Sequence, residues 1–113
     1  MQTIQTFDRS TLVPEVERPD PEIVIEGDPE HTTWLAEDRD GLYCGMWQCT
    51  PGKWKVSYSE WEYIRVHSGL SILIGDDGSE TRLAAGTSLI IRPGFTGIWH
   101  CVETMLKDFV ILE

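Results

Sequence analysis

Regularly spaced turn signals are the feature that most constrains the fold of this chain. From Trp34 onward, short runs rich in Val, Ile, Leu, Trp and Tyr alternate with glycine-containing turn pairs, mostly 8–11 residues apart. Runs of this length and composition are typical of β-strands joined by tight turns. No window of ten or more residues carries the 3.6-residue apolar period of an amphipathic helix. We therefore predict an all-β sandwich or barrel built from antiparallel hairpins.

The turn positions divide the chain into an N-terminal arm, 1–33, and a barrel, 34–113. Four of the six prolines fall within the arm, and proline disfavours helix interiors and central strands. The arm should be extended, with one short strand at 23–25 that lies along a sheet edge. A hairpin turn is expected at Gly69. The predicted barrel strands are 42–49, 53–58, 61–67, 70–75, 80–84, 88–92, 97–102 and 106–112.

Charge and cysteine content exclude several classes of function. The chain of 113 residues is long enough for one domain. Its net charge is −10, of which −8 falls in residues 1–40, and a field of this sign repels nucleic acid and anionic membranes. There is no apolar run of membrane-spanning length and no signal-peptide pattern at the start, so we expect a cytoplasmic protein. Three cysteines without a C-x-x-C pair indicate free thiols.

Alternation within the predicted strands assigns their faces. In 61–67, Glu62, Ile64 and Val66 share one face, while Arg65 and His67 lie on the other. The first set should point inward because it holds Ile and Val, which places the Glu62 carboxylate at the inner rim of the barrel. In 97–102, alternation groups positions 97, 99 and 101 against 98, 100 and 102, and hydrophobicity does not decide which set points inward.

Several fragments carry a family resemblance when their order and spacing are taken together. They are GMWQCTPGKW (45–54), SYSEWEYIRVHSG (57–69), DDGSETRLAAGTSLIIRPGF (76–95), TGIW (96–99) and ETMLKDFVI (103–111). The segment that they span resembles the small cupins related to ureidoglycine aminohydrolase and the ethanolamine-utilisation cupin. The resemblance implies a single RmlC-like jelly-roll barrel that forms a homodimer. An open barrel edge and the apolar strand of the arm also favour pairing with a second subunit.

The metal motifs of cupins are largely missing from this chain. In metal-binding cupins, two His and a Glu precede a hairpin glycine, and a further His follows a second turn. Glu62 and Gly69 match this pattern, whereas Val56, Tyr58 and Gly97 stand where the His residues are found. One ligand of four would hold an ion weakly, so we expect no bound metal. A weakly held divalent ion recruited by Glu60, Glu62 and Cys101 is the alternative.

The remaining polar and aromatic residues suggest a small-molecule site in the barrel mouth. We expect Tyr58, Glu62 and Trp99 there, beside Glu60, with Trp54, Phe95 and Trp47 as walls. The competing interpretation is that the aromatic residues are core. Lys107 alternates with Phe109 and Ile111, so it is expected to point inward and to pair with Glu62 or Glu60.

Three functional hypotheses follow from these residues. The first is a metal-free cupin that binds a small molecule. The second is an enzyme resembling the aminohydrolases, with Glu62, Tyr58 and Lys107 as catalytic candidates acting in acid–base chemistry or around an adventitious metal. The third is a structural dimer module with a vestigial pocket, in which the Glu62 ion pair only closes the barrel. The ligand itself is not encoded in any motif.

Overall fold

The computed structural model describes residues 3–113, which form nine β-strands and no helix. Every strand pair is antiparallel, and the prediction of an all-β fold is confirmed. Within the described range there is accordingly no apolar helix long enough to cross a membrane. The strands are β1 (Pro14–Glu17), β2 (Val24–Gly27), β3 (His31–Arg39), β4 (Leu42–Cys49), β5 (Gly52–Ser57), β6 (Trp61–Gly75), β7 (Glu80–Ala84), β8 (Ser88–Ile91) and β9 (Thr96–Leu112).

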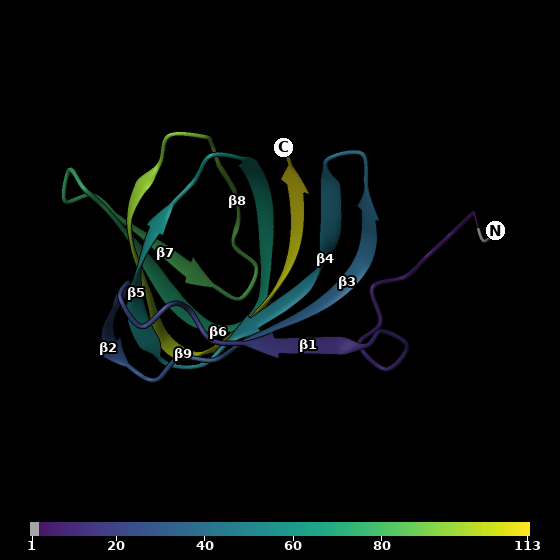
Figure 1. The fold of residues 1–113 in the computed structure, drawn as a ribbon, viewed down its shortest axis with the longest axis horizontal. Coiled ribbons are helices and arrows are strands. Elements are labelled where there is room, and N and C mark those ends of the chain that lie inside the picture. Colours follow the sequence, from purple (N-terminus) through teal and green to yellow (C-terminus); the bar gives the residue numbers. More distant parts are fainter. Residues whose placement is uncertain (1–2) are drawn as a thin grey trace.

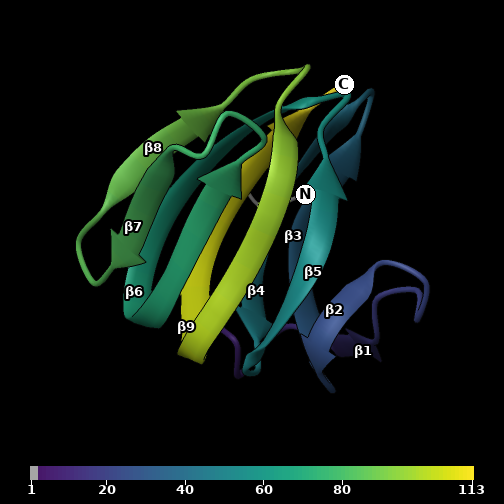
Figure 2. The same ribbon diagram turned by 90° about the vertical axis from the view of Figure 1, so that its left-hand side faces the viewer.

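The strands form one curled sheet that folds over on itself (Figure 1). The first half of β9 pairs with β5, its second half pairs with β4, and β6 runs along the other side of β9 throughout. One half of the sheet therefore has the order β1-β3-β4-β9-β6-β8, and the other has the order β2-β5-β9-β6-β7. Figure 2 shows β7 and β8 at one side of the sheet and β2 and β5 at the other. This is the two-layered arrangement of a jelly roll.

Two long bent strands replace four of the predicted short ones. The predicted strands 61–67 and 70–75 form the single strand β6, and 97–102 and 106–112 form the single strand β9. The hairpin turn expected at Gly69 is therefore wrong. Gly69 instead lies within a run of register shifts between Val66 and Ser71, where β6 bends against β9. Its φ of 85° and its close approach to the Thr104 carbonyl oxygen both require glycine.

The irregularity at Gly69 changes which residues of β6 point inward. Before it, Glu62, Ile64 and Val66 are buried, as alternation predicted, whereas after it Ser71 and Leu73 are buried. The interval of five residues between Val66 and Ser71 breaks the two-residue period. Both halves of the strand consequently turn their apolar side toward the same interior.

In β9, the residues at 97, 99 and 101 point inward, which hydrophobicity alone did not decide. Gly97, Trp99 and Cys101 are buried, and the same phase continues through Met105, Lys107 and Phe109 in the second half of the strand. Trp99 lies directly opposite Trp54 of β5. The core gathers around these strands and consists of Cys49, Trp54, Ile64, Val66, Leu73, Leu83, Ile91, Trp99, Cys101 and Met105.

The N-terminal region holds more strand than the sequence indicated. The expected strand at 23–25 corresponds to β2, which pairs with β5, but β1 is a second strand in this region, and it pairs with β3. β3 was not predicted at all, although it begins at His31 and supplies a wall of the barrel. Pro14 begins β1, and Pro19, Pro21 and Pro29 lie on either side of β2. These prolines made the two strands hard to predict, because proline usually ends a ladder.

We predict that Gly69→Ala destabilises the fold more than Gly78→Ala does. Both glycines have nearly the same positive φ, but a Cβ at Gly78 has no atom within 4 Å, whereas at Gly69 it would collide with the backbone of Thr104. Gly78→Ala should cost about 1–2 kcal/mol for the left-handed conformation alone. Gly69→Ala should exceed that loss by at least about 1 kcal/mol, because the backbone has to move. Urea unfolding of both variants measures the difference, and equal losses would contradict a tight contact between β6 and β9.

Candidate functional site

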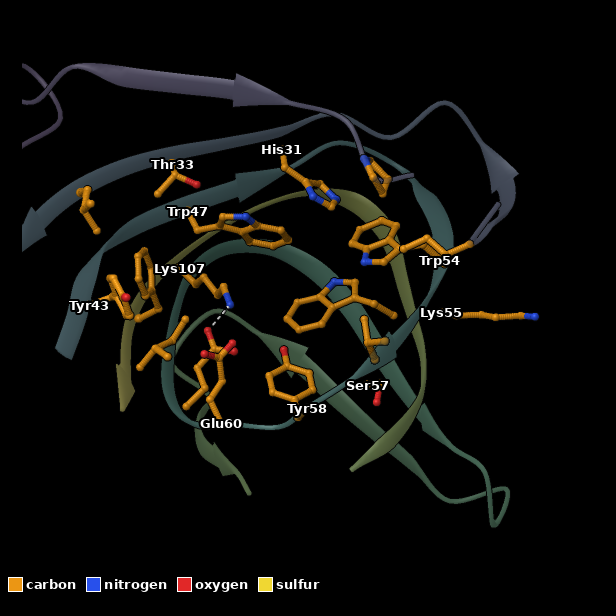
Figure 3. Close-up of a pocket in the computed structure, with 18 residues that line it drawn as sticks. His31, Thr33, Tyr43, Trp47, Trp54, Lys55, Ser57, Tyr58, Glu60 and Lys107 are labelled. Atoms are coloured by element: carbon orange, nitrogen blue, oxygen red, sulfur yellow. Dashed lines mark hydrogen bonds and ion pairs between the residues drawn. The ribbon is translucent and has the colours of Figure 1, made fainter. Parts of the chain in front are cut away.

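A cavity of about 580 Å³ opens inside the curled sheet (Figure 3). Its walls come from β3, β4, β5, β6 and β9 and from the connections before β2 and after β5. The lining residues are Pro19, Ile23, His31, Thr33, Leu35, Tyr43, Trp47, Trp54, Lys55, Val56, Ser57, Tyr58, Glu60, Glu62, Trp99, Lys107, Phe109 and Ile111. Eleven of these eighteen side chains are apolar or aromatic and seven are polar or charged, a mixture that is usual in a small-molecule site.

A buried ion pair lies in the wall of this cavity. Lys107 Nζ donates a hydrogen bond to Glu62 Oε2 at 2.7 Å, and the two side chains are only 5% and 4% exposed. In the β6–β9 ladder Lys107 lies opposite Val66, which shares its inward face with Glu62 four residues earlier in β6. The long lysine side chain therefore runs along the inner face toward Glu62. The prediction that Lys107 points inward and pairs with one of two glutamates is confirmed, with Glu62 as the partner.

Aromatic faces enclose the Lys107 ammonium on its other sides. Nζ lies 4.6 Å from the centroid of the Trp47 ring and 4.9 Å from that of Trp99. Trp47 is brought there by pairing directly opposite Lys107 in the β4–β9 ladder. Cation–π attraction in a desolvated setting contributes roughly 2 kcal/mol. Together with Glu62, the indoles replace the hydration that burial removes from the charge.

Three indoles form a continuous aromatic wall. Trp54 and Trp99 are stacked with an interplanar angle of 9° and a centroid distance of 6.3 Å, and Trp47 meets Trp99 edge-on at 5.5 Å. Trp99 Nε1 donates to Ser71 Oγ at 3.0 Å, which satisfies its polar edge inside the core. Trp54 and Trp99 belong to the core cluster and also line the cavity. Trp54 and Trp99 are therefore core residues that also form part of the cavity wall.

His31 is a cavity residue that the sequence did not reveal. Its ring lies 4.9 Å from that of Trp47 and 4.6 Å from that of Trp54. Burial, with a smaller effect of the Lys107 charge, lowers the pKa of His31 to about 4, so the imidazole is neutral near pH 7. Its Nε2 atom is buried and has no hydrogen-bond partner among residues 3–113. The alternation of His31, Thr33 and Leu35 was the available signal, but it was obscured because β3 follows the proline-rich arm.

Tyr58 and Glu60 come from the connection between β5 and β6. The Tyr58 N–H donates to the Phe95 carbonyl and the Gly94 N–H donates to the Tyr58 carbonyl, which fixes this connection against the β8–β9 turn. Burial, followed by the nearby Glu62 carboxylate, raises the pKa of Tyr58 far above its usual value and keeps the phenol protonated. Burial and the carboxylates of Glu113 and Glu62 raise the pKa of Glu60.

The structure brings together most of the predicted site residues. Tyr58, Glu60, Glu62, Trp54, Trp99 and Lys107 all line the cavity, as does Trp47. Phe95 was also predicted as a ligand-binding wall, but it is not among the residues that line this cavity. Its ring packs behind Tyr58 at a centroid distance of 6.2 Å and borders a separate hollow beside β8. The Pro93-Gly94 turn reverses the chain just before Phe95, so strand alternation did not predict where this side chain points.

The donor set does not fit the metal site of metal-binding cupins. Val56 has no donor atom, and at Gly97 even a Cβ would collide with the carbonyl oxygen of Ile74, so there is no space for an imidazole. Glu62 is already neutralised by Lys107. Cys101 lies outside the cavity, where its thiol donates to the Glu103 carbonyl oxygen at 3.2 Å. Within residues 3–113, no group of three or more His, Cys, Asp or Glu residues converges as a metal site would require.

We predict that Lys107→Met costs about 3–5 kcal/mol of unfolding free energy, because it leaves the buried Glu62 carboxylate without a partner. The double variant Lys107→Met/Glu62→Gln should be more stable than Lys107→Met alone, since the remaining amide is uncharged. Urea unfolding of the wild type, both single variants and the double variant completes the cycle. Additive losses would show that the two side chains are not coupled.

We also predict that the half-buried, neutral His31 makes the fold sensitive to acid. The unfolded chain takes up a proton on this imidazole near pH 6.5, whereas the folded protein does so only near pH 4, so acidification favours unfolding over this interval. Relative to His31→Phe, which keeps a ring between the indoles, the wild type should lose about 1–2 kcal/mol from about pH 7 to about pH 5. Parallel pH profiles of unfolding for the two proteins would contradict the assignment.

Solved structures with the same fold include proteins of several kinds. A protein of unknown function from Pseudomonas syringae pv. tomato aligns with a TM-score of 0.78 and 21% identity, over 91% of this chain and 45% of that one. The ethanolamine utilization protein Q of Salmonella typhimurium aligns with a TM-score of 0.65 and 16% identity, over 90% of this chain and 97% of that one. The polyketide cyclase RemF from Streptomyces resistomycificus aligns with a TM-score of 0.70 and 15% identity, over 97% of this chain and 80% of that one. This chain thus spans less than half of the Pseudomonas protein, and identities this low show the fold alone.

Sequence comparison is more specific than these structural similarities. No curated protein matches the chain significantly. The sequence profile of the EutQ-like cupin domain, however, matches residues 36–109, which extend from β3 to the second half of β9. The matched segment contains Glu62 and Lys107 and most of the residues around the cavity. The chain therefore belongs to the EutQ-like cupin domain family.

Proposed function

We propose that this cupin binds a small organic molecule in the cavity between β3, β4, β5, β6 and β9, without a bound metal. The observation that carries the proposal is the cavity itself. Its volume of about 580 Å³ lies in the range of roughly 300–1,000 Å³ found for ligand pockets. Its walls combine the aromatic surface of Trp47, Trp54 and Trp99 with a small set of polar groups.

The unpartnered His31 supports a ligand rather than a filled core. A buried polar atom without a hydrogen bond costs about 1–3 kcal/mol, and native interiors rarely keep such an atom. The Nε2 atom of His31 is in this position, on a ring held between Trp47 and Trp54. A molecule in the cavity that hydrogen-bonds to this atom would recover the lost free energy.

The buried ion pair between Glu62 and Lys107 supports the proposal that the cavity holds no metal. Glu62 is the one acidic residue that matches the metal motif, and its carboxylate already accepts a hydrogen bond from Lys107. The ammonium thus provides the positive charge that the acid requires. Binding would then depend on the shape, stacking and hydrogen bonds of the ligand.

We expect at least one compound in a panel of ureides, amino acids, sugars, short carboxylates and aryl amines to raise the melting temperature at millimolar concentration. A ligand at about 100 times its Kd stabilises the folded state by about 2.7 kcal/mol. The matched variants are Thr33→Phe, whose ring would fill the cavity, and Thr32→Phe, on the opposite face of the same strand. The shift should disappear in Thr33→Phe and persist in Thr32→Phe.

Three results would contradict the proposal. One is a stoichiometric transition metal in protein purified without a histidine tag, which would require donors other than those in the cavity. Another is the absence of any shift across the panel, which would favour a structural module with a vestigial cavity. The third is a shift that survives Thr33→Phe, which would place the ligand elsewhere on the molecule.

A further inference from the structure

We infer that the cavity selects a small molecule carrying an ammonium group and a flat ring over uncharged or anionic molecules of the same shape. This inference rests on the proposed function and names the chemical class of its ligand. It follows from the charged side chains of the cavity that have no partner of opposite charge.

Five residues that line the cavity have basic or acidic side chains: His31, Lys55, Glu60, Glu62 and Lys107. The Glu62–Lys107 pair has no net charge, and its ammonium is enclosed by two indoles, so it offers little to an incoming anion. Lys55 is exposed and extends away from the cavity in Figure 3. His31 is neutral near pH 7. The uncompensated charge is the carboxylate of Glu60.

The surroundings of Glu60 are acidic rather than basic. The carboxylates of Glu113 and Glu62 both act on it, and Glu113 also acts on Tyr43 at the same end of the cavity. No salt bridge to Glu60 is formed within residues 3–113. An ammonium group placed at Glu60 would provide the missing cation, whereas a carboxylate there would add to the repulsion.

The rest of the cavity fits a flat apolar ring. Figure 3 shows Glu60 and Tyr58 on one side of the cavity and His31 with Trp54 on the other. Trp54 and Trp99 are only 3% and 2% exposed, so the aromatic surface open to a planar group is mainly that of the partly exposed Trp47, next to the His31 ring. A ligand with an ammonium group at Glu60 would therefore place its ring against Trp47.

The test uses three probes that share a phenyl ring on a short chain: phenethylamine, hydrocinnamate and hydrocinnamamide. Each is titrated into the full chain near pH 8, where the carboxylates are ionised, with intrinsic tryptophan fluorescence and calorimetry as readouts. Phenethylamine should bind at least about tenfold more tightly than hydrocinnamate, which corresponds to one charge-assisted hydrogen bond gained. Hydrocinnamamide should lie between the two.

Glu60→Gln tests the residue, and Glu80→Gln is its matched control, since it removes the same charge from an exposed position on β7. Glu60→Gln should weaken phenethylamine binding about tenfold and leave hydrocinnamamide unchanged, whereas Glu80→Gln should alter neither. Equal or tighter binding of hydrocinnamate overturns the inference and leaves the proposed function standing. If none of the three probes binds while another compound of the broader panel does, the inference is also overturned and the proposed function stands. If no compound of either set binds, both proposals fall.

Discussion

The pairing of β6 with β9 is the constraint on which the rest of the molecule depends. These strands run side by side through both halves of the sheet, so any bend in one has to be accommodated by the other. The bend occurs at Gly69, where the backbone of β6 closely approaches that of Thr104. Because β6 also changes phase there, Glu62 from its first half and Ser71 from its second half face the same interior. An unbroken alternation would have turned one of the two halves outward.

The same pairing determines the chemistry of the interior. β9 keeps one phase along its length, so Trp99 in one half of the sheet and Lys107 in the other both face inward. Trp99 therefore meets the charge of Lys107 and stacks on Trp54 of β5. An ion pair this deeply buried adds little net stability, because desolvation offsets its attraction. Its main effect is orientation, since Glu62 and two indole faces hold the lysine in one place.

Much of this fold could be predicted from sequence, because strand segments and inward faces follow from local alternation. Lys107 was predicted correctly since it shares an uninterrupted strand with Phe109 and Ile111. The choice between Glu62 and Glu60 as its partner depends on a diagonal contact between β9 and β6, which no local pattern encodes. Gly69 was misinterpreted because Ser-Gly is typical of hairpins, and a bulge within a continuous strand uses the same glycine conformation.

The errors around the cavity have a common physical origin. His31 was missed because β3 follows a proline-rich segment and was assigned to the extended arm, although β3 and β4 form a hairpin across Asp40-Gly41. Phe95 was misplaced because it follows a turn, where alternation does not extend.

The tight spacing at Gly97 limits how this barrel can change over evolution or in the laboratory. The α-carbon of Gly97 faces the backbone of β6 so closely that any side chain would push the two strands apart. Imidazoles engineered at Val56 and Tyr58 would therefore lack the fourth donor expected from the family pattern. A metal centre of that family pattern would require a wider gap between these strands, or a donor from β3.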